Sequence, residues 1–305
     1  MKQAVVIHNP NSGKRKNVIE ILKKSKEIFL KYGYDCQIVN TKYKGHAEEI
    51  LSNIKSVDLI ISVGGDGTFN EIVTGNLHRS NRIPISHIPV GTANDLRDLF
   101  GLGSDILKNI ELILSGENKE IDLCLINNQP FVYVAGFGKF MNISYDTPRK
   151  QKSKFGYLAY LGAGFIDFFR PIERYDIDYE IDGKVYNGKY TLGIISNANR
   201  IAGVKNFYKD VKLDDDYFEV LLCKTHKKDK FLKSLVDIGL NDVTKAKGFD
   251  FFRTNNIKIH FNNKLKNPWT IDGEKFSNNC DYYEVKIKKM QFRLSSDAVK
   301  KNCMR

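Results

Sequence analysis

The sequence predicts an α/β fold, with a doubly wound, mostly parallel α/β domain followed by a β-rich, antiparallel sandwich domain. In residues 1–125, short apolar runs alternate with segments of helical periodicity, which is typical of a parallel sheet covered by helices. Residues 126–305 instead show short alternating stretches between turns, which favours antiparallel strands. A chain of 305 residues also exceeds the usual size of one core, so we expect two domains with these bounds. The last residues are candidates to return to the first domain.

The first domain shows a repeated order of strand, loop and helix. The expected strands are residues 4–8, 36–39, 59–63 and 85–89. The expected helices are one within 18–29, one at 47–54, one that begins at 69 and one at 106–114. Because ligands of such sheets bind at the carboxyl ends of the strands, the loops after these strands are the first candidates for a site.

The second domain is predicted to be mainly strands. They are expected at residues 175–181, 190–196, 217–223, 257–261 and 282–287, with helices near 158–169 and 230–240. Asp182-Gly183 separates two alternating runs and predicts a tight hairpin.

Composition limits the partners. The net charge of +12 attracts phosphate-bearing molecules, but no basic run or aromatic RNA-stacking motif accompanies it, so we expect no nucleic-acid partner. Five dispersed cysteines without a CxxC pair predict reduced thiols, and His8 and His87 are expected to be buried on strands. No signal peptide or membrane-spanning stretch is evident, which predicts a cytoplasmic protein.

Three glycine-containing loops each close a strand and open a helix. They are residues 9–13, 64–68 and 91–95. Main-chain N–H groups and a helix dipole at such a turn hold anions, and three of them at one sheet edge predict a rim that binds phosphate. The first loop lacks the spacing of a Walker motif. Asp66 lies inside the second loop and is a candidate Mg²⁺ ligand, whereas Asp95 and Asp122 are weaker candidates.

Four ordered motifs resemble the catalytic domain of diacylglycerol kinases, and specifically the soluble bacterial lipid kinases. The motifs are Asn9-Pro10-Asn11-Ser12-Gly13, Gly64-Gly65-Asp66-Gly67-Thr68 with Asn70, Pro89-Val90-Gly91-Thr92-Ala93-Asn94-Asp95, and Asp272-Gly273-Glu274. Thr41 and the stretch 155–160 fit the same family, so the resemblance covers nearly the whole chain.

The resemblance implies a two-domain enzyme that transfers the γ-phosphate of ATP to a lipid hydroxyl, most simply that of diacylglycerol. The implied ATP contacts are Asn9, Pro10, Asn11, Ser12, Gly13, Thr41, Gly64, Gly65, Asp66, Gly67, Thr68, Asn70 and Thr92. The implied catalytic residues are Glu274, as the proton acceptor, with Asp66 and Asp272.

The resemblance also implies a structural Mg²⁺ in the loop 212–217. Its ligands would be the carboxylate of Asp215 and the main-chain oxygens of Lys212 and Tyr217. The sequence departs from the family here, because Asp216 stands where a glycine is usual. An exposed acidic turn is an equal alternative for this loop.

A contact with membranes is predicted from residues 149–168. Arg149, Lys150, Lys152 and Lys154 precede an apolar face of helical spacing, and this composition is typical of a helix that rests on anionic lipid. Internal packing of the same face is the alternative. The expected localisation is therefore cytoplasmic with peripheral membrane association.

Two other functions share some of these features. NAD kinases carry a similar second loop, and a lipid-sensing protein without catalysis could retain the fold. The third loop, the stretch 155–160 and the late Asp272-Gly273-Glu274 favour the lipid kinase over an NAD kinase. The intact Asp66, Asn70, Asp95 and Glu274 argue against a protein without catalysis, although Asp216 leaves room for one. The identity of the lipid and the oligomeric state, including a homodimer, stay open.

Overall fold

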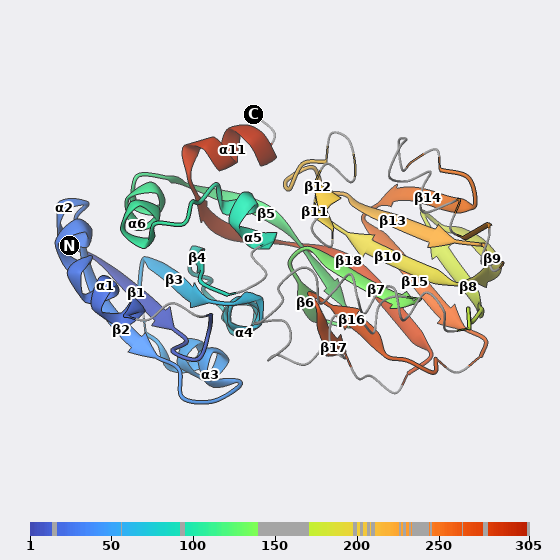
Figure 1. The fold of residues 1–305 in the computed structure, drawn as a ribbon, viewed down its shortest axis with the longest axis horizontal. Helices are drawn as coiled ribbons and strands as arrows, with labels where there is room; N and C mark the ends of the chain where they lie inside the picture. Colours follow the sequence, from blue (N-terminus) through green and yellow to red (C-terminus); the bar gives the residue numbers. More distant parts are fainter. Residues whose placement is uncertain are drawn as a thin grey trace. The chain divides into compact units, whose positions relative to one another are not determined.

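The computed structural model describes residues 1–13, 17–55, 57–91, 95–139, 171–197, 200–201, 204–205, 208, 211–225, 227, 230–231, 233, 244, 246–263, 265–276 and 280–303. The chain forms two compact units (Figure 1). The first unit comprises Met1–Ile121 and Lys289–Arg305, and the second comprises Asp122–Lys288.

The first unit is built on a parallel sheet. Its strands β1 (Lys2–His8), β2 (Tyr34–Asn40), β3 (Leu59–Gly64) and β4 (Ile85–Pro89) pair in the order β2-β1-β3-β4. The end of β18 (Tyr282–Leu294) adds a parallel neighbour, with Phe292 opposite Ile85. Every residue of β3 and β4 is buried, which explains their unbroken apolar sequences.

Two groups of helices cover this sheet. The first group, α1 (Val18–Lys24), α2 (Lys26–Lys31) and α6 (Ile106–Leu114), is mutually in contact, and α3 (His46–Asn53) contacts α4 (Asp66–Leu77). Right-handed crossovers place such groups on opposite faces, because the chain reverses its direction across the sheet after β2. The short helices α5 (Asp95–Phe100) and α11 (Ser296–Asn302) contact each other.

Two predicted helices differ in detail from the structure. The helix expected within 18–29 is divided at the buried Ser25, whose hydroxyl donates to the Leu22 carbonyl at 2.7 Å and so helps to end the first segment. Helix α4 begins at Asp66 rather than at Phe69, so the second glycine loop supplies the first turn of the helix.

The second unit is an antiparallel β-sandwich. One sheet contains β18, β15 (Asn256–Phe261), β8 (Tyr175–Ile181) and β9 (Lys184–Tyr190), with β5 (Glu117–Ile126) and β6 (Gln129–Phe131) attached. The other has the order β14-β13-β10-β7-β16-β17. Its strands are β14 (Phe249–Thr254), β13 (Phe218–Cys223), β10 (Leu192–Ser196), β7 (Val134–Gly138), β16 (Trp269–Ile271) and β17 (Glu274–Phe276). A short hairpin joins β11 (Arg200–Ile201) and β12 (Val204–Lys205).

One core fills the space between these two sheets. Phe137 and Trp269 from one sheet pack against Phe261 and Tyr283 from the other, with ring centroids 4.9 to 6.4 Å apart. The alternating burial of β8 shows one face turned to this core. The predicted fold class is therefore confirmed: a mostly parallel α/β unit and a β-sandwich.

The predictions for the hairpin, for the two histidines and for the reduced cysteines are also confirmed. Asp182 and Gly183 have φ values of 51° and 74° and connect β8 to β9 in a hairpin. His8 and His87 are buried on β1 and β4. The five cysteines are unpaired, and all but Cys280 are buried. Within the described residues, no helix is both long and apolar enough to cross a membrane. The helix expected at 158–169 and most of 230–240 lie outside the described residues.

Candidate active site

The first glycine loop turns tightly at the carboxyl end of β1. The Asn9 side-chain oxygen accepts from the Asn11 main-chain N–H at 3.0 Å, and the Asn9 carbonyl accepts from the Ser12 N–H at 3.1 Å. Gly13 has a φ of 75°, and a Cβ added there would lie 1.9 Å from the Val90 carbonyl oxygen. Glycine is required at this position because both the backbone conformation and the close approach exclude a side chain.

The second loop lies against the first. The Gly65 main-chain N–H donates to the Ser12 hydroxyl oxygen at 3.2 Å, and the Asn9 side-chain amide donates to the Thr68 hydroxyl at 2.9 Å. These bonds join loops that are more than fifty residues apart in the sequence. The predicted convergence of the first two loops at one edge of the sheet is thus visible in the structure.

The third loop begins beside the other two. The Val90 N–H donates to the Gly64 carbonyl at 2.9 Å, and the Val90 carbonyl faces Gly13. Thr92 lies outside the described residues, as does the side chain of Asp95. The start of this loop therefore belongs to the same rim.

Asp66 is the first residue of α4, directly after the two glycines of the second loop. Gly65 is the N-cap and has no side chain to cap the helix, which leaves the helix terminus suited to an anion. Asp66 is half-buried, and Asn70 lies one turn further along the same helix. A carboxylate at this terminus is stabilised by the helix dipole, and it would repel a bound phosphate unless a cation lay between them.

Thr41 follows β2 at the same end of the sheet. Its N–H donates to the His8 carbonyl at 2.8 Å, and its side chain is buried. Thr41 therefore lies beside the start of the first loop, on the side of the edge strand.

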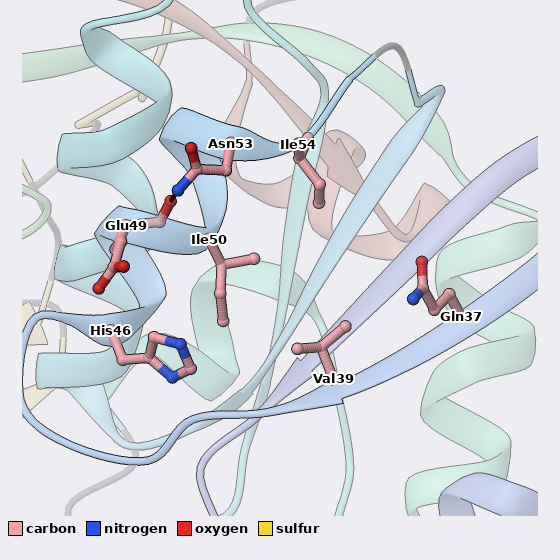
Figure 2. Close-up of a pocket in the computed structure, with 7 residues that line it drawn as sticks. All are labelled: Gln37, Val39, His46, Glu49, Ile50, Asn53 and Ile54. Carbon is pink, nitrogen blue, oxygen red and sulfur yellow. Dashed lines mark hydrogen bonds between the residues drawn. The ribbon is translucent and has the colours of Figure 1, made fainter.

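A shallow hollow of about 250 Å³ lies between β2 and α3 (Figure 2). Its lining residues are Gln37, Val39, His46, Glu49, Ile50, Asn53 and Ile54. None of the predicted site residues lines it, so it is not the predicted phosphate site.

In the second unit, Asp272-Gly273 forms the turn between β16 and β17. Asp272 and Gly273 have φ values of 47° and 81°, and Ile271 pairs with Glu274. This turn places the Glu274 side chain at the first residue of β17, where it is exposed.

The Asp272 carboxylate is held by main-chain donors. It accepts from the N–H groups of Val132, Tyr133 and Val134 at 2.8 to 3.2 Å, and it is buried. The Asp272 N–H in turn donates to the Val134 carbonyl at 2.9 Å. Bonds of this kind stabilise the ionised carboxylate and fix the turn next to Glu274, which suits a positioning residue better than a proton acceptor.

The predicted metal loop is organised around Asp215. Its two carboxylate oxygens accept from the N–H groups of Lys212 and Tyr217 at 3.3 and 3.1 Å. Asp216 adopts a left-handed φ of 66°, the conformation that glycine would take at this position, and its N–H donates to Asp122 at 2.7 Å. Asp122 is therefore part of this loop's support in the second unit.

Two residues of this cluster were not singled out from the sequence. Arg253 lies 2.5 Å from the Asp215 carboxylate and 3.8 Å from Glu219, and its guanidinium stands over the Tyr217 ring at 4.8 Å. Burial raises the pKa of Glu219 to about 8, with a further increase from Asp215 and an opposing effect of Arg253. Because Glu219 and Arg253 lie on separate strands, only their pairing across β13 and β14 brings them together.

Comparison with known proteins identifies relatives along most of the chain. The family model for the diacylglycerol kinase catalytic domain matches residues 3–126. A diacylglycerol kinase of Bacillus subtilis is 30% identical over 282 residues, which is 90% of each chain. A diacylglycerol kinase of Staphylococcus epidermidis is 35% identical over 231 residues, which is 73% of this chain and 71% of the relative.

Solved structures show the same fold. A crystal structure of a diacylglycerol kinase from Bacillus anthracis matches with a TM-score of 0.78 and 22% identity, and the match covers 98% of each chain. Fold, loops and relatives define the class of the protein as a lipid kinase, an enzyme that transfers phosphate to an alcohol group. The chain belongs to the diacylglycerol kinase catalytic domain family, as the motifs predicted.

Proposed function

We propose that the protein transfers the γ-phosphate of ATP to the hydroxyl group of diacylglycerol and thereby forms phosphatidic acid. The observation that carries this proposal is the pair of hydrogen bonds from Gly65 to Ser12 and from Asn9 to Thr68. They hold two glycine loops together at the carboxyl edge of a parallel sheet, which is where phosphates bind in such folds. The names of the relatives supply the lipid.

The ATP phosphates would bind at the linked loops. The second loop would contribute main-chain N–H groups at the start of α4, because the first amides of a helix lack carbonyl partners within it. The first loop would lie beside the phosphates, since Ser12 and Asn9 hold it against the second loop. Thr41, Asn70 and Thr92 remain predicted contacts, and Thr41 and Asn70 are described residues of the same unit as these loops.

Asp66 would hold a Mg²⁺ ion that accompanies ATP. Its position fits this role, because its carboxylate begins α4 among the phosphate-binding amides and oxygen is the ligand that Mg²⁺ prefers. When bound, the ion neutralises charge on the transferring phosphoryl group.

Glu274 would accept the proton of the lipid hydroxyl. As the hydroxyl oxygen forms its bond to the γ-phosphorus, the bond from that phosphorus to the ADP oxygen breaks, and the hydroxyl proton passes to the Glu274 carboxylate. Asp272 would position Glu274 through the three amides that fix the turn.

The lipid would be reached by peripheral contact with an anionic membrane through residues 149–168, which lie outside the described residues. The net charge of +12 supports this part of the proposal, since it attracts a negative surface. A homodimer stays a prediction that sedimentation equilibrium can test.

A radiolabelled ATP assay against separate acceptors tests the proposal. Mixed micelles would contain diacylglycerol, monoacylglycerol, a polyprenol or a sphingoid base, and a further reaction would offer NAD in solution. We expect label in phosphatidic acid, with little label in the other products. Label in NADP would instead support the NAD kinase alternative, and ATP binding without transfer to any acceptor would support a lipid-sensing protein.

A further inference from the structure

The loop from Lys212 to Tyr217 buries the acidic side chain of Asp215, and a second acid, Glu219, is buried beside it on β13. The side chains of Asp215 and Glu219 are only 4% and 3% exposed, and both face the Arg253 guanidinium. Carboxylates at that depth require a cation or strong donors nearby, because ionised groups are costly to remove from water.

The donors around Asp215 do not fit a magnesium ion. Mg²⁺ takes a nearly octahedral shell of oxygen ligands at about 2.0–2.1 Å. Asp215 already accepts two main-chain N–H groups, and the guanidinium of Arg253 lies 2.5 Å from one of its oxygens. An ion on that oxygen would have to displace the arginine. Among the described residues, no group of three acidic, histidine or cysteine side chains is arranged to hold a metal.

The guanidinium of Arg253 places a positive charge next to these two acidic side chains. Its guanidinium contacts Asp215 at 2.5 Å, faces Glu219 at 3.8 Å and covers the Tyr217 ring at 4.8 Å. A planar guanidinium suits this position because it can donate to carboxylates while stacking on an aromatic ring. The strand pairing of Arg253 opposite Glu219 fixes its place.

We propose that Arg253 supplies from within the chain the positive charge that the loop from Lys212 to Tyr217 needs, so that this loop folds without a divalent cation. The proposal concerns the stability of the second unit and requires neither ATP nor lipid. It is therefore independent of the proposed function, in which Mg²⁺ is bound with ATP at Asp66.

The test compares thermal unfolding of the full chain without nucleotide, in EDTA and in millimolar Mg²⁺. We expect the wild-type Tm to be the same in both. Arg253→Gln removes the charge and should lower the Tm in EDTA by about 5 °C or more, because the buried Asp215 carboxylate loses its cation. Arg253→Lys should keep most of the wild-type Tm. Mg²⁺ should stabilise Arg253→Gln and leave wild type unchanged.

Lys258→Gln is the matched control. Lys258 pairs with Glu180 at 3.2 Å on the surface of the same unit, where loss of the charge should change the Tm little and create no response to Mg²⁺. Arg253→Gln with the wild-type Tm in EDTA would overturn the proposal. If that variant does not fold, calorimetry without nucleotide on wild type and Asp215→Asn decides. Binding of Mg²⁺ to wild type that Asp215→Asn removes would overturn the proposal, whereas no binding, or binding that Asp215→Asn retains, supports it.

Discussion

The main-chain N–H of Gly65 donates a hydrogen bond to the hydroxyl oxygen of Ser12, with 3.2 Å between the two heavy atoms. Ser12 follows β1 and Gly65 follows β3, and these two strands are neighbours in the parallel sheet. The bond therefore ties two phosphate-binding candidates into one rim, and a displacement of either loop would disturb the other.

Asp66→Asn should reduce lipid phosphorylation by about 10²-fold or more, because an amide neither binds Mg²⁺ as strongly nor neutralises its charge. The fold should be retained, since Asp66 lies at a helix start rather than in the core. Steady-state rates in mixed micelles, with circular dichroism as a check of the fold, measure both quantities.

Asp297→Asn is the control for this change. Asp297 is also an acid in the first turn of a helix of the first unit, so its removal costs a similar dipole interaction of about 0.3–1 kcal/mol without touching the loops. Turnover close to wild type in a folded Asp66→Asn protein would remove Asp66 from the mechanism.

Glu274→Gln should lower kcat by about 10²-fold or more, since a general base accelerates a reaction by about 10² to 10⁴-fold. The affinity for ATP should stay nearly unchanged. Asp272→Asn should lower both kcat and the Tm, because it weakens three hydrogen bonds that fix the turn. Single-turnover rates measure the loss of rate in each variant, equilibrium binding measures the affinity for ATP, and thermal unfolding measures the Tm. Loss of ATP binding with an unchanged rate at saturation would make Glu274 a nucleotide contact instead.

Gly13→Ala should destabilise the protein and weaken ATP binding. The added Cβ would lie 1.9 Å from the Val90 carbonyl, so the first loop must move away from the third. Gly33→Ala is the matched control, because Gly33 has a similar φ of 78° but nothing within 4 Å of its Cβ position. Strain of the left-handed backbone costs about 1–2 kcal/mol in both variants. Any further loss of stability in Gly13→Ala measures the cost of the close approach between the added Cβ and the Val90 carbonyl. Equal effects of the two changes on Tm and on ATP binding would contradict this account.

Stability should decrease in acid because of His87. Burial lowers the pKa of His87 from 6.5 to about 3, so the folded protein keeps this ring neutral at a pH where the unfolded chain protonates it. The contribution of the neutral His87 ring to the free energy of unfolding is fully present above about pH 6.5. It is lost as the pH falls toward 3, with a slope of about 1.4 kcal/mol per pH unit. Urea unfolding between pH 7 and pH 4 measures the slope.

His87→Leu should reduce that slope, because leucine carries no proton and still fills the space beside Phe69 and Phe100. His260→Leu is the control, since the His260 side chain is 48% exposed and is hydrated in both states. An identical acid slope in wild type and His87→Leu would show that another group governs it.

Replacement of Arg149, Lys150, Lys152 and Lys154 by glutamine should weaken binding to anionic vesicles. Each basic residue near such a surface contributes about 1 kcal/mol, so four should matter for docking. The apparent KM for lipid in vesicles should rise, while activity on a short-chain soluble analogue is retained. Sedimentation with vesicles at low salt measures the binding, and equal binding of the quadruple variant and wild type would exclude this segment as the membrane contact.

The sequence alone predicted the fold class and the three loops, because these depend on local pattern. Strands buried on both faces, such as β3 and β4, require unbroken apolar runs, and the glycine turns after them follow from backbone conformation. The hairpin at Asp182-Gly183 was predictable for the same reason.

Tertiary structure alone decided which distant groups meet. The contact of Gly13 with Val90, the amides of Val132 to Val134 around Asp272 and the pairing of Arg253 with Asp215 join residues up to 140 positions apart. Strand order and register determine such contacts, and they arise from packing across the whole unit rather than from neighbouring residues. For this reason the resemblance to a known family could imply a metal ion at the loop from Lys212 to Tyr217, but only the folded chain brings the guanidinium of Arg253 to Asp215 in that loop.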